Sequence, residues 1–240
     1  MPASSAAPHC PAARRPPAGP CTCTAGGAYT SEITGQHWAL VGALADEGVR
    51  VEVPLYGPTP RRTHREAYPL VTEVYRRLPD HVPAAAVTLA GDSAGAGLAL
   101  GGGRELPAAG LPQPRRIALI SPWLDLTLSN PAVRAVAPHG AWLTPEGLVE
   151  MGRARADGDD PADPRLSPVN GSLKGLAPVS GFIGTRDVIY PDVCRLRERA
   201  AAEGTPLEVT VCAGAVHVHP LTPTPEGRAA AARIVEDISR

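Results

Sequence analysis

The sequence predicts an α/β fold in which a doubly wound, mostly parallel sheet is covered by helices on both faces. Segments with the pattern of strands alternate with segments with the pattern of helices, which is the order typical of parallel sheets. Ile117 to Ile120 is a continuous apolar run, as expected for a strand buried on both faces. At 240 residues the chain is long enough for one domain with a sizeable core.

The individual elements follow from the spacing of apolar residues. Helices are expected where apolar residues recur three or four positions apart, and strands where they alternate or run continuously. In chain order we expect a helix over 32–48, a strand over 49–53, a helix over 65–78, a strand and a helix on either side of Ser93, a strand over 117–120, a helix over 145–155, a strand over 179–184, a helix over 191–203, a strand over 207–212 and a helix over 225–238.

Residues 1–25 are expected to form a disordered tail, and residues 26–240 to form the domain. Met1 to Pro20 hold six prolines and six alanines. Such a segment cannot bury enough apolar surface to offset the entropy lost on ordering. Cys21 to Ala25, at the end of this tail, also has the pattern of a short strand.

The composition argues against nucleic acid, membranes and metals as partners. The formal net charge is −1, which predicts no attraction to polyanions. No apolar run reaches the length of a membrane span, and the N-terminus has no continuous apolar core of a secretory signal, so we expect a cytoplasmic protein. The five cysteines, at positions 10, 21, 23, 194 and 212, form no metal-ligand or paired pattern, so free thiols are expected.

Gly91-Asp92-Ser93-Ala94-Gly95 lies between an apolar strand and an apolar helix. This Gly-x-Ser-x-Gly pattern in a strand-turn-helix context is typical of a nucleophile elbow, in which a strained turn exposes the serine hydroxyl. The amide of Ala94, at the start of the helix, is expected to point toward an oxyanion formed there. A glycine-rich turn without chemistry is the alternative.

A serine hydroxyl needs a histidine to take its proton, and a carboxylate to fix the tautomer of that histidine. In a parallel sheet these groups are expected in loops at the carboxyl ends of strands. Asp187 follows the strand 179–184, and His217 follows the strand 207–212. The order Ser, Asp, His along the chain is that of the α/β-hydrolases.

Other acidic residues and histidines of the sequence are alternatives for the same roles. Asp125 also follows a strand and is the alternative acid, although capping explains it equally well. His219 is the alternative base, disfavoured because Pro220 constrains its backbone. Asp92 is expected to brace neighbouring loops. The remaining histidines have no matched partner and are expected on the surface or in loops; they are His9, His37, His64, His81 and His139.

Four segments resemble the hormone-sensitive-lipase branch of the α/β-hydrolases, the fold-3 esterases. These are Gly91 to Gly95, Ser121-Pro122-Trp123-Leu124-Asp125, Gly184-Thr185-Arg186-Asp187 and Val216-His217-Val218, and Gly26-Gly27-Ala28-Tyr29 is similar to the end of the family's His-Gly-Gly-Gly oxyanion motif. The resemblance implies Ser93 as nucleophile, His217 as general base and Asp187 as its orienting acid. It also implies an oxyanion hole formed by Gly26, Gly27, Ala28 and Ala94.

The chain departs from the family pattern at two places. Ala25 stands where the family has the histidine of the oxyanion motif, and only residues 1–25 precede that motif. We therefore expect an N-terminally abbreviated hydrolase fold. A catalytically weak or silent binding protein on a truncated hydrolase scaffold is the alternative function.

The resemblance implies a serine carboxylesterase that hydrolyses short- to medium-chain acyl esters through an acyl-enzyme. It implies a small-molecule ester substrate, no cofactor and no metal. Amide hydrolysis by the same triad and a homo-oligomeric state both stay open. Trp123 and Trp142 are expected in the core rather than in an acyl pocket.

Overall fold

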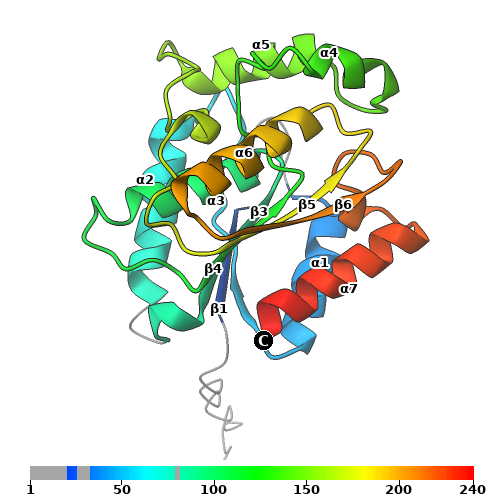
Figure 1. Cartoon of the computed structure of the whole chain (residues 1–240). Helices are drawn as coiled ribbons and strands as arrows, with labels where there is room; N and C mark the ends of the chain where they lie inside the picture. Colours follow the sequence, from blue (N-terminus) through cyan, green and yellow to red (C-terminus); the bar gives the residue numbers. More distant parts are fainter. Residues whose placement is uncertain (1–20, 26–32, 79–81) are drawn as a thin grey trace, which may run out of the picture.

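The fold is that of a computed structural model, which describes residues 21–25, 33–78 and 82–240. Six parallel strands form one sheet in the order β2-β1-β3-β4-β5-β6 (Figure 1). Their bounds are β1 Cys21–Ala25, β2 Arg50–Glu52, β3 Val87–Asp92, β4 Arg116–Ile120, β5 Val179–Gly184 and β6 Leu207–Cys212. Because all neighbours run parallel, every strand ends at the same edge of the sheet.

Helices cover both faces of this sheet, which confirms the predicted doubly wound α/β class. One face carries α1 (Gly35–Asp46) and α7 (Pro225–Ser239), which lie side by side in Figure 1. The other face carries α2 (His64–Arg77), α3 (Ala94–Glu105) and α6 (Tyr190–Glu203). Two further helices, the short α4 (Val133–Val136) and the longer α5 (Pro145–Ala156), belong to the long segment between β4 and β5.

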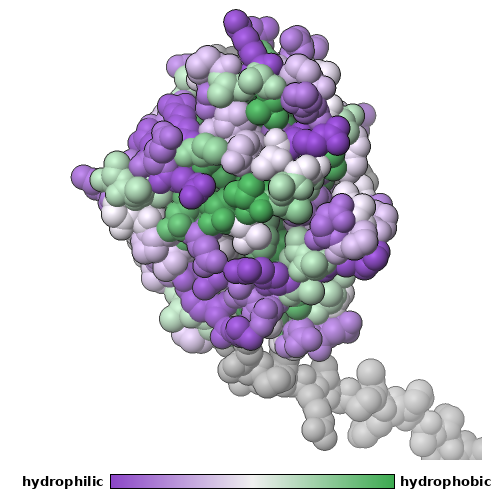
Figure 2. Space-filling model, turned by 45° about the vertical axis from the view of Figure 1, so that its right-hand side comes forward, coloured by the Kyte–Doolittle hydropathy of each residue, from purple (hydrophilic) through white to green (hydrophobic). Residues whose placement is uncertain are grey.

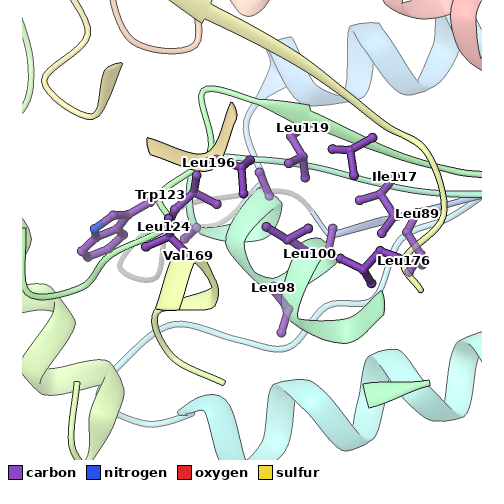
Figure 3. Packing of buried hydrophobic residues seen from close by; sticks show 14 of the residues in the cluster. Leu89, Leu98, Leu100, Ile117, Leu119, Trp123, Leu124, Val169, Leu176 and Leu196 are labelled. Carbon is purple, nitrogen blue, oxygen red and sulfur yellow. The ribbon is translucent and has the colours of Figure 1, made fainter. Parts of the chain in front are cut away.

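Alternate residues of β4 fill the two cores. Ile117 and Leu119 belong to the larger core, where Figure 3 shows them together with Leu98 and Leu100 of α3. Ala118 and Ile120 belong to the smaller core under α1 and α7. Successive side chains of a strand point to opposite faces, and here both faces are buried. This explains why β4 is apolar from Ile117 to Ile120 rather than alternating.

Three consecutive glycines in α3 allow close packing, although glycine normally destabilises a helix. A Cβ at Gly101 would lie 2.0 Å from the Tyr68 hydroxyl of α2. A Cβ at Gly103 would lie 2.7 Å from a methyl carbon of Ile117. The glycines therefore bring α3 close to its neighbour helix and to the sheet.

The sheet begins earlier than the predicted domain boundary. Cys21 to Ala25 form β1, which pairs with both β2 and β3 and lies inside the sheet. The expected tail over residues 1–25 is therefore wrong for its last five residues, because the short strand pattern there has two neighbours to pair with. Residues 1–20 lie outside the described residues.

The segment between β4 and β5 is more regular than expected. It contains α4 and two 3-10 turns, η3 (Ala137–His139) and η4 (Pro168–Asn170), in addition to the one helix that the sequence predicts. Two further 3-10 turns are η2 (Ala84–Ala86) and η5 (His219–Leu221). These short turns start at prolines or short apolar runs, which helical periodicity cannot detect.

The outer side of the α1–α7 layer is hollowed. A groove of about 1000 Å³ runs between the two helices, with Ala39, Leu40, Ala43 and Val235 among its apolar residues. Figure 2 shows a hydrophobic patch near the middle of a mostly hydrophilic side of the molecule.

None of the helices in the described part of the chain has the length and apolar character that a membrane span requires. The described residues also bring no three metal-ligating side chains together.

Candidate active site

Ser93 occupies the sharp turn between the end of β3 and the start of α3. Its backbone has φ 50° and ψ −116°, a conformation that non-glycine residues rarely adopt. The Ser93 N–H donates to the carbonyl of Ile120 at 2.9 Å, and the Ser93 carbonyl accepts from the N–H of Trp123 at 3.0 Å. The strained turn is therefore held by the end of β4 and by the loop that follows it.

The turn also depends on a glycine in the first turns of α3. A Cβ at Gly97 would lie 2.4 Å from the carbonyl oxygen of Trp123. Such a contact is far below van der Waals distance with a backbone atom. Glycine at this position lets α3 and the loop after β4 pack closely enough for the Ser93 hydrogen bonds.

The structure brings Ser93, His217 and Asp187 into one hydrogen-bonded line. His217 Nε2 lies 3.0 Å from Ser93 Oγ, and His217 Nδ1 lies 2.9 Å from Asp187 Oδ2. Since a carboxylate only accepts, Nδ1 carries the proton and Nε2 is free to accept from the serine hydroxyl. All three residues are buried, with exposed fractions of 7%, 9% and 1% for Ser93, His217 and Asp187.

The loops that carry Asp187 and His217 interlock. The N–H of Arg186 donates to the carbonyl of Ala215 at 3.0 Å, and the N–H of Thr185 donates to the carbonyl of Cys212 at 3.1 Å. A Cβ at Gly184 would lie 2.1 Å from the carbonyl oxygen of Ala215. Glycine at the end of β5 thus allows the two loops to touch, which fixes Asp187 against His217.

Ser121 holds the residue that follows His217, a contact that sequence reasoning missed. Val218 has φ 46°, a left-handed conformation that is strained for a β-branched residue. Its N–H donates to Ser121 Oγ at 2.9 Å. Ser121 belongs to a segment that carried the family resemblance, but no local pattern indicates which backbone group its hydroxyl would bind.

Asp125 and His219, the alternative acid and the alternative base, do not join the hydrogen-bonded line of Ser93, His217 and Asp187. The carboxylate of Asp125 accepts hydrogen bonds from the backbone and hydroxyl groups of Thr127 and Ser129. Burial alone would raise the pKa of Asp125, but these hydrogen bonds outweigh it and lower the pKa. His219 is buried in η5, and this burial lowers its pKa. Neither residue is hydrogen-bonded to Ser93 or His217 among the contacts of the described residues.

Two histidines expected on the surface or in loops are instead partly or fully buried. His64 hydrogen-bonds the carbonyl of Arg155 at 3.1 Å and approaches Asp159 at 3.0 Å. His37 Nε2 lies 3.2 Å from Asp92 Oδ2, beside Ser93. The expectation was wrong because the partners of both rings are distant in sequence. Asp92 does brace a neighbouring segment, as expected.

The predicted oxyanion residues are only partly described. Ala94 is the first residue of α3 and directly follows Ser93. Gly26, Gly27 and Ala28 lie outside the described residues. Ala25, the departure from the family motif, is the last residue of β1 and pairs with Gly91 of β3. This pairing places the start of the motif beside the strand that leads into the elbow.

A concavity of about 1170 Å³ lies in the segment between β4 and β5. Trp142 lines it and is 58% exposed, so the expectation of a core position is wrong for this residue. Trp123 is in the core, where its indole N–H donates to the carbonyl of Asp125 at 3.0 Å. The Arg186 side chain donates to the carbonyl of His139 at 3.0 Å, which joins this segment to the loop of Asp187.

A parallel α/β sheet with serine, histidine and aspartate converging at the carboxyl ends of its strands is the arrangement of the α/β-hydrolases. The family model of the alpha/beta hydrolase fold matches residues 23–221. The chain belongs to this family, and its structural neighbours include hormone-sensitive-lipase-like esterases, as the motifs predicted.

The relatives of this chain include an acetyl-hydrolase and an esterase. An acetyl-hydrolase from Streptomyces hygroscopicus is 34% identical over 214 residues, which cover 85% of this chain and 70% of that protein. An esterase from Acinetobacter venetianus is 32% identical over 181 residues, or 73% of this chain and 59% of that protein. The chain thus spans about three fifths to seven tenths of the length of these relatives.

Solved structures agree with this class. A hormone-sensitive lipase from a metagenome library superposes with a TM-score of 0.87 at 27% identity, over 92% of this chain and 76% of that one. The esterase EstE5, soaked with p-nitrophenyl butyrate, has a TM-score of 0.86 at 27% identity, over 95% of this chain and 78% of that one. Relatives and structures together support a carboxylic ester hydrolase.

Proposed function

We propose that the chain is a serine carboxylesterase that acts through Ser93, His217 and Asp187. The observation that carries the proposal is the continuous hydrogen-bonded line, 3.0 Å from Ser93 Oγ to His217 Nε2 and 2.9 Å from His217 Nδ1 to Asp187 Oδ2. These lengths suit direct proton transfer. The same line argues against the silent binding protein, because a binder does not need an oriented base beside a strained serine.

In the first half-reaction His217 Nε2 takes the hydroxyl proton as Ser93 Oγ attacks the ester carbonyl carbon. Asp187 stabilises the imidazolium that forms and stays ionised. The tetrahedral oxyanion accepts hydrogen bonds from the amide of Ala94 and, by the family pattern, from those of the Gly26 to Ala28 segment. As the carbon–oxygen bond to the alcohol breaks, His217 returns the proton to the leaving alkoxide, which leaves an acyl-serine.

In the second half-reaction water takes the place of the alcohol. His217 removes a proton from the water as its oxygen attacks the acyl-serine carbonyl. Collapse of the second tetrahedral intermediate breaks the bond to Ser93 Oγ, which receives the proton from His217. The products are a carboxylic acid and the free enzyme.

We propose short- to medium-chain acyl esters as the substrate class. An acetyl-hydrolase is among the relatives, and an EstE5 crystal was soaked with a butyrate ester. A panel of p-nitrophenyl esters from acetate to laurate tests this, with turnover expected to be highest below about eight carbons.

A fluorophosphonate probe tests the nucleophile directly. It should label the wild-type chain, and the Ser93→Ala variant should lose the label while keeping the circular dichroism spectrum of a folded α/β protein. Equal labelling of the two proteins, or no labelling of folded wild type, would overturn the proposal.

A further inference from the structure

His37 bridges the start of α1 and the nucleophile turn. The ring lies at the third residue of α1, where the Thr34 backbone N–H donates to His37 Nδ1 at 3.0 Å and the Thr34 hydroxyl lies 2.7 Å from the same nitrogen. On its other side, Nε2 lies 3.2 Å from Asp92 Oδ2. Asp92 immediately precedes Ser93, so one side chain spans two segments that are 55 residues apart.

The hydrogen bonds assign a tautomer to this ring. A backbone N–H only donates, so Nδ1 must accept from Thr34. The proton of the neutral ring then sits on Nε2, where it faces a carboxylate that only accepts. A single neutral tautomer satisfies both ends of the bridge. The Asp92 carboxylate raises the pKa of His37, and a protonated ring would keep the bond to Asp92 but oppose the Thr34 N–H.

A comparison within the chain separates helix capping from a second role. The N-terminus of α2 has the same capping box, with the Thr63 N–H donating to Glu66 Oε2 at 2.7 Å. Glutamate is the usual residue at this third position, and it also suits the positive end of the helix dipole. Capping alone therefore does not require histidine in α1. The feature that distinguishes His37 from Glu66 is the carboxylate that it faces.

The surroundings of the pair make this contact strong. His37 and Asp92 line a small cavity of about 40 Å³ between α1, the sheet and α7. The other residues of its lining in the described part of the chain are apolar or glycine, among them Leu40, Ala90 and Ile120. The two side chains are 17% and 10% exposed. In such an environment a hydrogen bond to a charged group is stronger than at the surface.

We propose that His37 is a positioning residue for the reaction, which holds the nucleophile turn in register with the start of α1 through Asp92. The inference rests on the proposed function, since it assigns His37 a task in Ser93 chemistry. Ser93 sits in a strained conformation between Asp92 and α3, so movement of Asp92 changes the direction of the Ser93 hydroxyl. Small misplacements of a reacting group lower the rate of the chemical step more than they weaken binding.

Three substitutions separate positioning from capping. In His37→Gln the amide oxygen can accept from Thr34 and the amide nitrogen can donate to Asp92, so both bonds are retained. In His37→Glu the cap is retained, but a second carboxylate faces Asp92. Gln36→Glu is the matched control, because it adds the same charge to the same turn of α1 at an exposed position.

We expect kcat for p-nitrophenyl butyrate to fall on the order of 10-fold or more in His37→Glu, with KM changed about 2-fold at most. His37→Gln and Gln36→Glu should stay within about 3-fold of wild type in kcat. Thermal unfolding followed by circular dichroism should show that all three proteins fold. Equal kcat in His37→Glu and His37→Gln would overturn the inference, since the residue would then serve only as a helix cap.

A rescue variant keeps the test decisive if His37→Glu folds poorly. In the double variant His37→Glu/Asp92→Asn the donor and acceptor exchange places, because the asparagine amide donates to the glutamate. We expect the double variant to recover most of the kcat lost in His37→Glu. Failure to recover in a folded double variant would also overturn the inference. Absence of turnover in wild type would instead count against the proposed function, which separates the two failures.

Discussion

The backbone N–H of Val218 is hydrogen-bonded to Ser121 Oγ at 2.9 Å, and this contact joins the residue after His217 to the loop after β4. The Ser121 N–H in turn donates to the carbonyl of Phe182 in β5 at 2.7 Å. The loop of His217 is thus tied to β4 and β5 as well as to Asp187. The strained φ of 46° at Val218 persists because these contacts determine it.

We predict that Ser121→Ala lowers both stability and turnover. The Val218 N–H would lose its partner, and an unsatisfied group of this kind costs about 1–3 kcal/mol. The turnover number should fall together with the midpoint of urea unfolding. Ser180→Ala is the matched control, because the Ser180 hydroxyl is buried in β5 and has no hydrogen-bond partner in the described part of the chain. The control should be neutral or stabilising; equal losses in both variants would contradict the prediction.

Asp187→Asn should lower kcat by about 10⁴-fold, the effect expected when the orienting acid can no longer fix the tautomer of the base. Asp125→Asn should affect mainly stability, because Asp125 binds Thr127 and Ser129 rather than His217. Single-turnover kinetics with a p-nitrophenyl ester measure the first effect and thermal unfolding measures the second. A larger loss of kcat in Asp125→Asn than in Asp187→Asn would reverse the assignment of the acid.

Asp192 should make the protein less stable as the pH rises through weakly acid values. Burial, together with the charge of Asp125, raises its pKa from 3.8 to about 6. The folded state then binds a proton more tightly than the unfolded state, so the free energy of unfolding falls between about pH 4 and pH 6 and levels off above. At about 1.4 kcal/mol per unit of pKa, the loss is on the order of 3 kcal/mol.

The variant Asp192→Asn tests this dependence, because the amide resembles the protonated acid. Its midpoint of denaturation should exceed that of wild type at pH 8 and differ little from it near pH 4. Urea unfolding at several pH values gives the comparison. An identical pH dependence in the two proteins would show that Asp192 does not titrate as described.

Replacing two helical glycines, Gly97 and Gly42, with alanine should change the stability of the protein in opposite directions. At Gly97 a Cβ would lie 2.4 Å from the Trp123 carbonyl oxygen, so Gly97→Ala should displace the nucleophile turn and lower stability and kcat. At Gly42 of α1 a Cβ meets nothing within 4 Å, so Gly42→Ala should stabilise by about 0.5–1 kcal/mol. Thermal unfolding of both variants checks the pair, and a stabilising Gly97→Ala would refute the account of the turn.

Local pattern predicted most of the fold, because the apolar residues of this chain are spaced as its elements require. Residues 117–120 of β4 are apolar on both faces, and α2 has its apolar residues on one side. The pattern was weaker for Cys21–Ala25, whose place inside the sheet depends on pairing with β2 and β3. Helical periodicity also could not indicate α4, which is only four residues long.

The candidate site was predictable where chain order and strand ends identify residues, as for Ser93, Asp187 and His217. It was not predictable where a side chain meets a distant partner. His37 contacts Asp92 across 55 residues, and Ser121 contacts Val218 across 97. Neither pair has a local spacing that could reveal it, because both arise from packing of the finished sheet.

The sheet order has a consequence for how catalytic competence is acquired during folding. The three candidate catalytic side chains follow β3, β5 and β6, with β4 between the first two of these strands. A partly assembled sheet that lacks β6 holds Ser93 without His217, and one that lacks β3 holds His217 and Asp187 without Ser93. Recovery of turnover after dilution from denaturant therefore requires that β3, β4, β5 and β6 have all assembled into one sheet.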